Sequence, residues 1–363
     1  MFYIRVDANN KIATGHVMRC MSIADEIKNR NIDVCFLTAD HNADVLLHKQ
    51  GFITKCLDSK WDNLESEMIS GKISSVLEND NNIKGILVDT YYVTEKYLDR
   101  LRKICKTIYI DDIFALHRYP VDFLLNYNIY GADLDYKSRC LPETKLLLGT
   151  KYVPLRKEFQ NIKPKFRKRV KNVFISTGGT DNFNIAGKIL DTIFKKSVIE
   201  KNSIFKEINY HVISGAMNKN LSYLLEISNK HNNIFIHQNV SNIAEIMSMC
   251  DIAISACGFT MYELCAYGLP IITYSFADNQ LHGIRKFYEL GVAINCGDVR
   301  DGIEKVVQSI LDNVVMMCGD NVRRLGYSRN ANALIDDKSI HNIVNIIMDS
   351  CLIREKYNLK NNF

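Results

Sequence analysis

The sequence predicts an α/β protein with two domains, each built around a parallel β-sheet. Short apolar runs, almost continuous in Val, Ile and Leu, alternate with longer amphipathic stretches, as expected for strands that are buried on both faces of a sheet. This alternation occurs in both halves of the chain. The length of 363 residues agrees with two domains of about 150 residues each.

The first half of the chain begins with an apolar run and continues as strand, helix, strand. Because the strands are separated by helical stretches, neighbouring strands are expected to run parallel. The predicted strands are 2–8, 34–39, 53–57, 85–89, 107–111, 123–126 and 145–148, and the predicted helices are 15–30, 41–50, 61–79 and 94–105.

The second half repeats this order of elements. Its predicted strands are 172–176, 210–214, 234–237, 252–255, 271–275 and 292–295. Its predicted helices are 183–197, 218–229, 241–249, 260–267, 279–289 and 302–314, followed by a last helix at 338–357.

These patterns divide the chain into two Rossmann-type domains, at 1–157 and 172–335. The segment 158–171 between them is basic, contains a proline and lacks a clear period. We interpret it as a solvated linker rather than as a nucleic-acid patch. For the final segment, 336–363, a return to the first domain stays open. Two such sheets facing each other would form a cleft, and ligands bind at the carboxyl ends of parallel strands.

Composition and charge exclude several classes of protein. Hydrophobic residues make up 47% of the chain and charged residues 24%, which is typical of a folded protein and excludes disorder as the main state. The net charge of +5 is too small and too dispersed for a nucleic-acid-binding footprint. The 11 cysteines include no Cys-x-x-Cys pair, so reduced thiols and a cytoplasmic location are expected. We find no signal-peptide pattern and no apolar run that could span a membrane, so no membrane insertion is expected.

The first candidate site follows the first predicted strand. His16 lies where a helix opens after this strand, and the positive end of a helix keeps a histidine neutral and basic. A neutral histidine at the end of a strand is suited to act as a general base. The alternative is that His16 only packs against the helix or caps it.

Two later loops share a strand, glycine and helix order. The first contains Gly178, Gly179 and Thr180, and the second contains Cys257 and Gly258. Glycines let backbone N–H groups approach a phosphate, and a helix end favours an anion. A plain tight turn is the alternative for the first loop.

An acidic residue follows the second of these loops, within the first turn of its helix. A carboxylate at Glu263 can accept both hydroxyls of a ribose, or it can simply complement the helix dipole. Beyond the next strand, Asp278 can cap a helix that carries Asn279 and Gln280 into the cleft.

Three further positions are candidates with open alternatives. Tyr91 follows a strand and can reach a sugar, or it can pack. Arg156 lies near the hinge and can pair with a ligand anion or with the other domain. The pair Asp111 and Asp112 has possible metal-binding capacity, but acidic residues often end strands, and we predict neither a metal nor a cofactor.

Taken together, these motifs resemble the hydrolases of UDP-2,4-diacetamido-2,4,6-trideoxy-β-L-altropyranose, which serve pseudaminic acid synthesis and are related to GT-B glycosyltransferases. The resemblance runs in order from residue 2 to about 300. It is carried by Arg5-Val6-Asp7-Ala8, by Gly15-His16-Val17-Met18-Arg19-Cys20, by Gly178-Gly179-Thr180-Asp181, by the block 255–270 and by Ala277-Asp278-Asn279-Gln280.

This resemblance implies a GT-B-like fold and the release of UDP from a UDP-sugar without a cofactor. It implies that His16 is the proton acceptor for a water that attacks the anomeric carbon with inversion. It implies substrate contacts by Asp7, Gly15, Arg19, Tyr91, Arg156, Asn279 and Gln280, and nucleotide contacts by Gly178, Gly179, Thr180, Cys257, Gly258 and Glu263. A glycosyltransferase, a hydrolysing UDP-N-acetylglucosamine epimerase and a binding protein without turnover are the alternatives.

The chain departs from the family pattern at three places. The family often has Asp-His-Tyr where Asp89-Thr90-Tyr91 stand here, and Gly-Gly-Ser where Cys257-Gly258-Phe259 stand. Near the C-terminus, Asp336-Asp337-Lys338-Ser339 replace a glycine-rich turn. These departures bear on the identity of the sugar more than on the fold.

Overall fold

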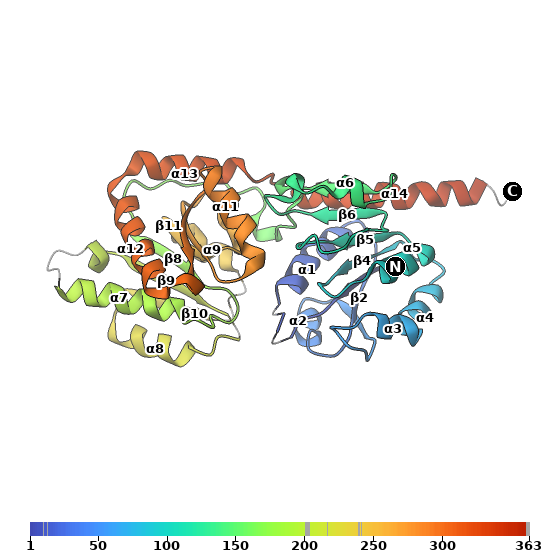
Figure 1. Ribbon diagram of the computed structural model, residues 1–363, viewed down its shortest axis with the longest axis horizontal. Coiled ribbons are helices and arrows are strands. Elements are labelled where there is room, and N and C mark those ends of the chain that lie inside the picture. The colour runs from blue at the N-terminus through green and yellow to red at the C-terminus, as the bar shows by residue number, and fades with distance from the viewer. Residues whose placement is uncertain are drawn as a thin grey trace. The chain divides into compact units, whose positions relative to one another are not determined.

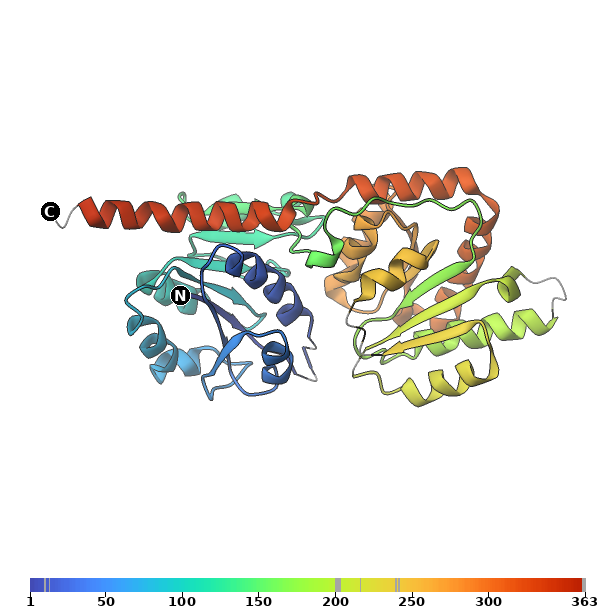
Figure 2. The same cartoon turned by 180° about the vertical axis from the view of Figure 1, so that it is seen from behind.

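The computed structural model describes residues 1–9, 11–12, 14–199, 204–215, 217–238, 240 and 242–360. The chain forms two compact units, and the first of them is made of two separate stretches of sequence. Unit 1 comprises Met1–Arg156 together with Lys338–Phe363, and unit 2 comprises Lys157–Asp337 (Figures 1 and 2). No helix in the described part of the chain has the length and apolar character needed to cross a membrane.

Unit 1 contains a seven-stranded parallel sheet with the order β3-β2-β1-β4-β5-β6-β7. Its strands are β1 (Phe2–Val6), β2 (Val34–Thr38), β3 (Ile53–Cys56), β4 (Gly85–Asp89), β5 (Thr107–Ile110), β6 (Phe123–Asn126) and β7 (Lys145–Leu148). Its helices are α1 (Gly15–Lys28), α2 (Asp44–Lys49), α3 (Glu65–Ile69), α4 (Lys72–Glu78), α5 (Glu95–Ile104), α6 (Tyr136–Arg139) and α14 (Ser339–Lys360).

The core of unit 1 follows from the alternation of side chains along these strands. Tyr3, Ile86 and Val88 are buried with apolar residues of α3, α4 and α5. The opposite face of the sheet carries Phe2 and Ile4, which are also fully buried, and α1 packs on β1 and β2. The C-terminal helix α14 packs on α1 and on the 3₁₀-helix η2 (Thr150–Tyr152).

Unit 2 contains a six-stranded parallel sheet with the order β10-β9-β8-β11-β12-β13. Its strands are β8 (Asn172–Ser176), β9 (Asn209–Ser214), β10 (Ile234–Gln238), β11 (Ile252–Ala256), β12 (Ile271–Ser275) and β13 (Ala293–Asp298). Its helices are α7 (Ile185–Ile199), α8 (Leu221–Lys230), α9 (Ile243–Met249), α10 (Thr260–Ala266), α11 (Leu281–Glu289), α12 (Ile303–Gly319) and α13 (Asn321–Ala333). Its apolar core joins one face of the sheet to α7, α8 and α12.

Two predicted helices differ from the structure, and the helices α6 and α13 have no predicted counterpart. The single helix predicted at 61–79 is two helices, α3 and α4, because Gly71 between them adopts a left-handed conformation with φ of +71°. Helix α12 extends to Gly319 rather than ending at 314. Helix α13 was not predicted, since its sequence is largely polar and lacks a helical apolar period; the side chain of Asp320 caps it by accepting from the amide of Arg323.

The basic segment 158–171 belongs to unit 2, and its lysine and arginine side chains are exposed. The guanidinium of Arg167 donates to the carbonyl oxygens of Ser248 and Cys250 and to the carboxylate of Asp251. The buried guanidinium of Arg324 donates to the carbonyl oxygens of Arg167 and Lys168. These bonds hold the backbone of the segment against the unit that it precedes.

Candidate functional site

In both units the strand order reverses beside the first strand, and ligands of open α/β sheets bind at such switch points. In unit 1 the switch lies between β1 and β4, and in unit 2 between β8 and β11. Asp89 ends β4, Gly178 and Gly258 lie in the loops after β8 and β11, and His16 lies at the start of α1, the helix that follows β1. The topology therefore puts a cluster of candidate side chains at the carboxyl edge of each sheet.

The centre of the unit 1 cluster is a close contact between a histidine and a carboxylate. His16 is the second residue of α1, and Asp89 is the last residue of β4. The Nδ1 atom of His16 lies 2.5 Å from Oδ1 of Asp89, and both side chains are buried. In the neutral imidazole, an ionised Asp89 accepts a hydrogen bond from Nδ1–H, and Nε2 is then the nitrogen that carries the lone pair.

Arg19 keeps this carboxylate ionised. It lies one turn after His16 on α1, and its guanidinium binds Asp89 through both carboxylate oxygens, at 2.6 and 2.5 Å. It also contacts Asp112 at 2.7 Å and donates to the hydroxyl of Tyr127. Burial would raise the pKa of Asp89, but the charge of Arg19 and the hydrogen bonds from Arg19 and His16 hold this pKa well below its usual range.

Tyr91 completes the cluster. Its ring packs edge-on against the His16 ring, with centroids 4.6 Å apart and planes at 84°. Its hydroxyl lies 3.5 Å from Oδ2 of Asp112. The structure thus brings Tyr91 together with His16 and Arg19, which belong to a different motif of the sequence.

Asp111 and Asp112 have different surroundings. Asp112 belongs to the His16 cluster, whereas Asp111 accepts hydrogen bonds from the amides of Ile113 and Phe114 and from the hydroxyl of Tyr136. Within the described ranges, no group of three or more His, Cys, Asp and Glu side chains is arranged to hold a metal ion.

The sequence analysis named Asp112 only within a possible metal-binding pair, and it gave Asp89 no role in the site. The available signal was position, because Asp89 ends a strand and Asp112 lies two residues beyond the end of another. A local sequence pattern does not show that β1 has two neighbours in the sheet. One is β2, the next strand in the sequence, and the other is β4. The Thr90 that replaces a family histidine accepts a hydrogen bond from the amide of Tyr92 and so helps to shape this loop.

Other unit 1 candidates lie outside the cluster contacts. Asp7 is engaged within the fold, since one of its oxygens accepts from Arg5 at 2.6 Å and the other from the amide of Ala39 at 2.7 Å. Gly15 is exposed at the start of α1. Arg156 is half-buried at the end of the first stretch of unit 1.

In unit 2, the loop after β8 carries the two exposed glycines Gly178 and Gly179. Gly178 has a φ of +85°, a left-handed conformation that favours glycine. Helix α7 begins at Ile185 rather than at the predicted residue 183, so it does not start directly after the glycines. The carboxylate of Asp181 accepts from the amides of Ile185 and Ala186, so it already occupies the end of α7. A ligand anion at this loop would therefore meet the backbone of the loop rather than the helix end.

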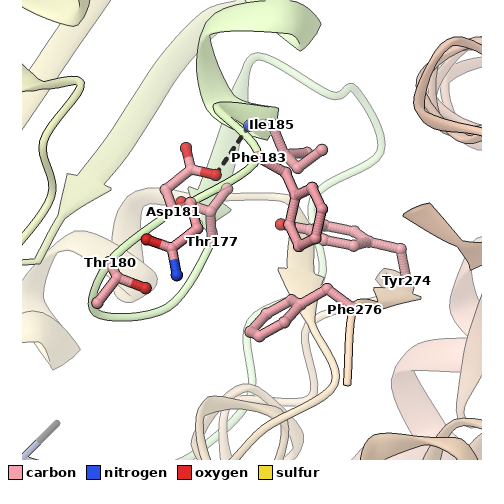
Figure 3. A pocket seen from close by; sticks show the side chains of 8 residues that line it. Thr177, Thr180, Asp181, Phe183, Ile185, Tyr274 and Phe276 are labelled. Atoms are coloured by element: carbon pink, nitrogen blue, oxygen red, sulfur yellow. Dashed lines mark hydrogen bonds between the residues drawn. The ribbon is translucent and has the colours of Figure 1, made fainter. Parts of the chain in front are cut away.

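Beside this loop lies a small pocket (Figure 3), lined by Thr177, Thr180, Asp181, Asn182, Phe183, Ile185, Tyr274 and Phe276. Figure 3 shows the bond from the amide of Ile185 to Asp181 at its wall. The rings of Phe183 and Phe276 lie 6.5 Å apart. Burial raises the pKa of the Asp181 carboxyl despite its hydrogen bonds.

The loop after β11 leads directly into α10. A Cβ atom at the exposed Gly258 would have no neighbour within 4 Å, so the space beside this backbone is open. Cys257 is buried, and burial raises the pKa of its thiol to about 12, which keeps it protonated. Glu263 lies in the first turn of α10 and is buried.

The segment predicted to bring Asn279 and Gln280 to the ligand is a short 3₁₀-helix, η5 (Asp278–Gln280). Asn279 is exposed, whereas Oε1 of Gln280 accepts from the amide of Phe276 at 2.9 Å and so supports the loop. Arg300 joins Asp278 to Asp298, at 2.7 and 2.8 Å.

The chain is similar in sequence to several known proteins. No protein-family model matches the chain. An uncharacterised protein of Methanocaldococcus jannaschii is 27% identical over 285 residues, which are 74% of this chain and 54% of that protein. A UDP-2,4-diacetamido-2,4,6-trideoxy-β-L-altropyranose hydrolase of Campylobacter jejuni is 25% identical over 246 residues, 67% of this chain and 80% of the hydrolase.

A Helicobacter pylori protein named as both a pseudaminic acid cytidylyltransferase and the same hydrolase is also 25% identical, over 77% of this chain and 45% of that protein. The chain thus spans about half the length of two of the curated relatives that it matches.

Solved structures confirm the predicted GT-B-like α/β fold. The MurG structure from Acinetobacter baumannii matches with a TM-score of 0.63 at 13% identity, over 96% of this chain and 99% of that one. The UDP complex of MnaA from S. aureus matches with a TM-score of 0.64 at 11% identity, over 95% of both chains.

Proposed function

We propose that this chain, a relative of the UDP-2,4-diacetamido-2,4,6-trideoxy-β-L-altropyranose hydrolases with a GT-B-like fold, hydrolyses that UDP-sugar to UDP and the free sugar. The observation that carries the proposal is the contact between His16 and Asp89 at the switch point of unit 1. The hydrolase relatives at 25% identity support the choice of substrate class.

The chemistry assigned to unit 1 is the activation of water. Nε2 of His16 takes a proton from a water molecule, whose oxygen attacks the anomeric carbon of the sugar. The bond from this carbon to the UDP oxygen breaks, and UDP leaves with the electron pair. Attack opposite the leaving group inverts the anomeric configuration. Asp89 stabilises the imidazolium that forms, and Arg19 holds Asp89 in place.

The remaining roles are proposals of the same kind. Tyr91 holds the sugar or the attacking water, since its ring is fixed against His16. In unit 2, the backbone of Gly178, Gly179 and Thr180 and that of Gly258 bind the diphosphate, and Glu263 binds the ribose. Further substrate contacts are assigned to Gly15, Arg156, Asn279 and Gln280.

The test is UDP release in the absence of an acceptor, with and without EDTA. We expect release in both conditions. In H₂¹⁸O, the label should enter the sugar and not the UDP, because the bond to carbon breaks. NMR of the first-formed sugar should show the anomeric configuration opposite to that of the substrate. Retention of configuration, or label in UDP, would contradict the mechanism.

A glycosyltransferase is the second candidate, favoured by the likeness to MurG in fold. In that reaction a sugar hydroxyl replaces water, and the same histidine takes its proton. This alternative predicts no UDP release until an acceptor is added, so the assay without acceptor separates the two reactions.

If the loop after β8 binds UDP, a substitution at Gly215, which follows β9, should weaken UDP binding. A Cβ atom added there would lie 2.6 Å from the Cα of Gly179. Gly215→Ala should therefore displace the Gly178–Gly179 loop and weaken UDP binding roughly tenfold, which corresponds to about 1.4 kcal/mol. Calorimetric titration with UDP measures the effect. Gly326→Ala is the matched control, because a Cβ atom there meets nothing within 4 Å; equal affinities in the two variants would refute the role of the loop.

A further inference from the structure

Two histidines form a pair at the edge of the unit 2 sheet, separate from the loops assigned to UDP. His211 lies on β9 and His237 on the edge strand β10, where the register pairs His211 with Phe235 and His237 with Ile213. Nδ1 of His211 lies 3.1 Å from Nε2 of His237, and the ring planes differ by 17°. Neither residue takes part in the proposed hydrolysis.

The surroundings of His211 fix which of its nitrogens carries the proton. The side-chain Nδ2 of Asn209 donates to Oδ1 of Asn172 at 3.1 Å, so this oxygen is an acceptor. Nε2 of His211 lies 3.3 Å from the same oxygen and must donate to it. Nδ1 of His211 is then unprotonated and directs its lone pair toward His237.

Access to the pair comes from the His237 side. His211 is buried, with its ring stacked on Phe235 at a centroid distance of 5.0 Å, whereas His237 is half-buried and Phe235 is 41% exposed. Burial lowers the pKa of both imidazoles, so both are neutral and able to act as ligands near pH 7.

We propose that His211 and His237 form a two-histidine site for a borderline divalent transition-metal ion such as Zn²⁺, Ni²⁺ or Cu²⁺. Two nitrogen ligands at about 2.0–2.1 Å from one ion lie roughly 2.9–3.4 Å apart for tetrahedral to octahedral angles, which brackets the spacing found here. The imidazole nitrogens select these ions over Mg²⁺ and Ca²⁺. A carbonyl acceptor behind a ligating histidine, here Asn172, is the usual outer-shell partner.

Water completes the coordination, because the pair is not part of any larger group of ligating side chains in the described residues. To bind the ion, His237 moves its proton from Nε2 to Nδ1, and no other covalent change is needed. The bound ion would join β9 to β10, the outermost strand of the sheet. This proposal is independent of the hydrolase proposal.

The test is titration of the metal-free protein with Ni²⁺ or Zn²⁺ alone, followed by calorimetry, with Mg²⁺ as the comparison ion. We expect one equivalent of Ni²⁺ or Zn²⁺ to bind and Mg²⁺ not to bind. His237→Gln should remove this equivalent, and since His237 is half-buried the variant keeps the core intact. His48→Ala, at an exposed histidine on α2, is the matched control and should bind as the unaltered protein does. Failure of the unaltered protein to bind, or equal binding by His237→Gln, overturns the proposal.

Two further measurements separate a metal site from a merely structural pair. Hydrogen exchange of the β10 amides should slow when Ni²⁺ is added to the unaltered protein and should not change in His237→Gln. Asn172→Leu removes the acceptor behind His211 and should weaken Ni²⁺ binding tenfold or more. Unchanged exchange and unchanged affinity in these experiments would count against the site.

Discussion

Replacing His16 by alanine is expected to lower the rate of UDP release by about 10²–10⁴-fold, the usual contribution of a general base. The variant retains the scaffold, but no other unprotonated imidazole nitrogen is held beside Asp89 in the described part of unit 1. Binding of UDP alone should be unchanged, because the loops assigned to the nucleotide belong to unit 2. Initial rates at saturating UDP-sugar, together with calorimetry of UDP, measure both quantities.

The matched control for this prediction is His48→Ala, which removes an exposed imidazole from α2 of the same unit. Its rate should equal that of the unaltered protein. Added imidazole should restore part of the lost rate in His16→Ala, since a small base can enter the space that the side chain leaves. A rate in His16→Ala within threefold of the unaltered protein would mean that another group activates the water.

Asp89→Asn is expected to destabilise unit 1 by about 3–5 kcal/mol at neutral pH, because it removes one partner of a buried ion pair. Arg19 would keep Asp112 as a partner but would lose both bonds to Asp89. Activity should fall as well, since a neutral amide stabilises the imidazolium of His16 less than a carboxylate does. Urea unfolding and initial rates provide the two measurements.

The loss of stability caused by Asp89→Asn should depend on pH. The pKa of Asp89 is lower in the folded protein than in the unfolded chain, so its stabilising contribution is full above about pH 4. The contribution is lost as pH falls toward the folded pKa and the carboxylate takes up a proton. The stability difference between the unaltered protein and Asp89→Asn should therefore be largest above pH 4 and should shrink below it.

Asp62→Asn, at an exposed aspartate of unit 1, is the control for this series. It should unfold as the unaltered protein does over the whole range of pH. If Asp89→Asn were as stable as Asp62→Asn at pH 7, the ion pair with Arg19 would contribute nothing to the fold.

The local pattern of the sequence was sufficient to predict most strands, because a strand that is buried on both faces carries a nearly continuous run of apolar residues. The predicted and observed bounds agree at 85–89, 123–126, 145–148, 172–176 and 271–275. The helices were harder where a single residue decides the outcome. Gly71 splits one helix by its left-handed backbone, and the polar helix α13 carries little apolar signal for its existence.

The site shows the same division between local and non-local information. His16 could be proposed because it directly follows a strand, but its partner Asp89 lies 73 residues away along the chain. Only the order of strands brings them together, and a local pattern does not contain that order. In the same way, no local pattern shows that Asp111 accepts a hydrogen bond from Tyr136 while its neighbour Asp112 contacts Arg19, or that Asp181 caps α7.

Unit 1 is made of two stretches of sequence that lie on either side of unit 2, and this arrangement sets the order in which the two units are completed during translation. Helix α14 is synthesised after all of unit 2, yet it belongs to unit 1: the hydroxyl of Ser339 donates to the carbonyl oxygen of Val153, and His341 bonds Glu26 on α1. Unit 2 is continuous, so all of its residues have been made before unit 1 receives its final helix. Synthesis of unit 1 thus starts before that of unit 2 and finishes after it, and until then the face of α1 that α14 covers lacks this helix.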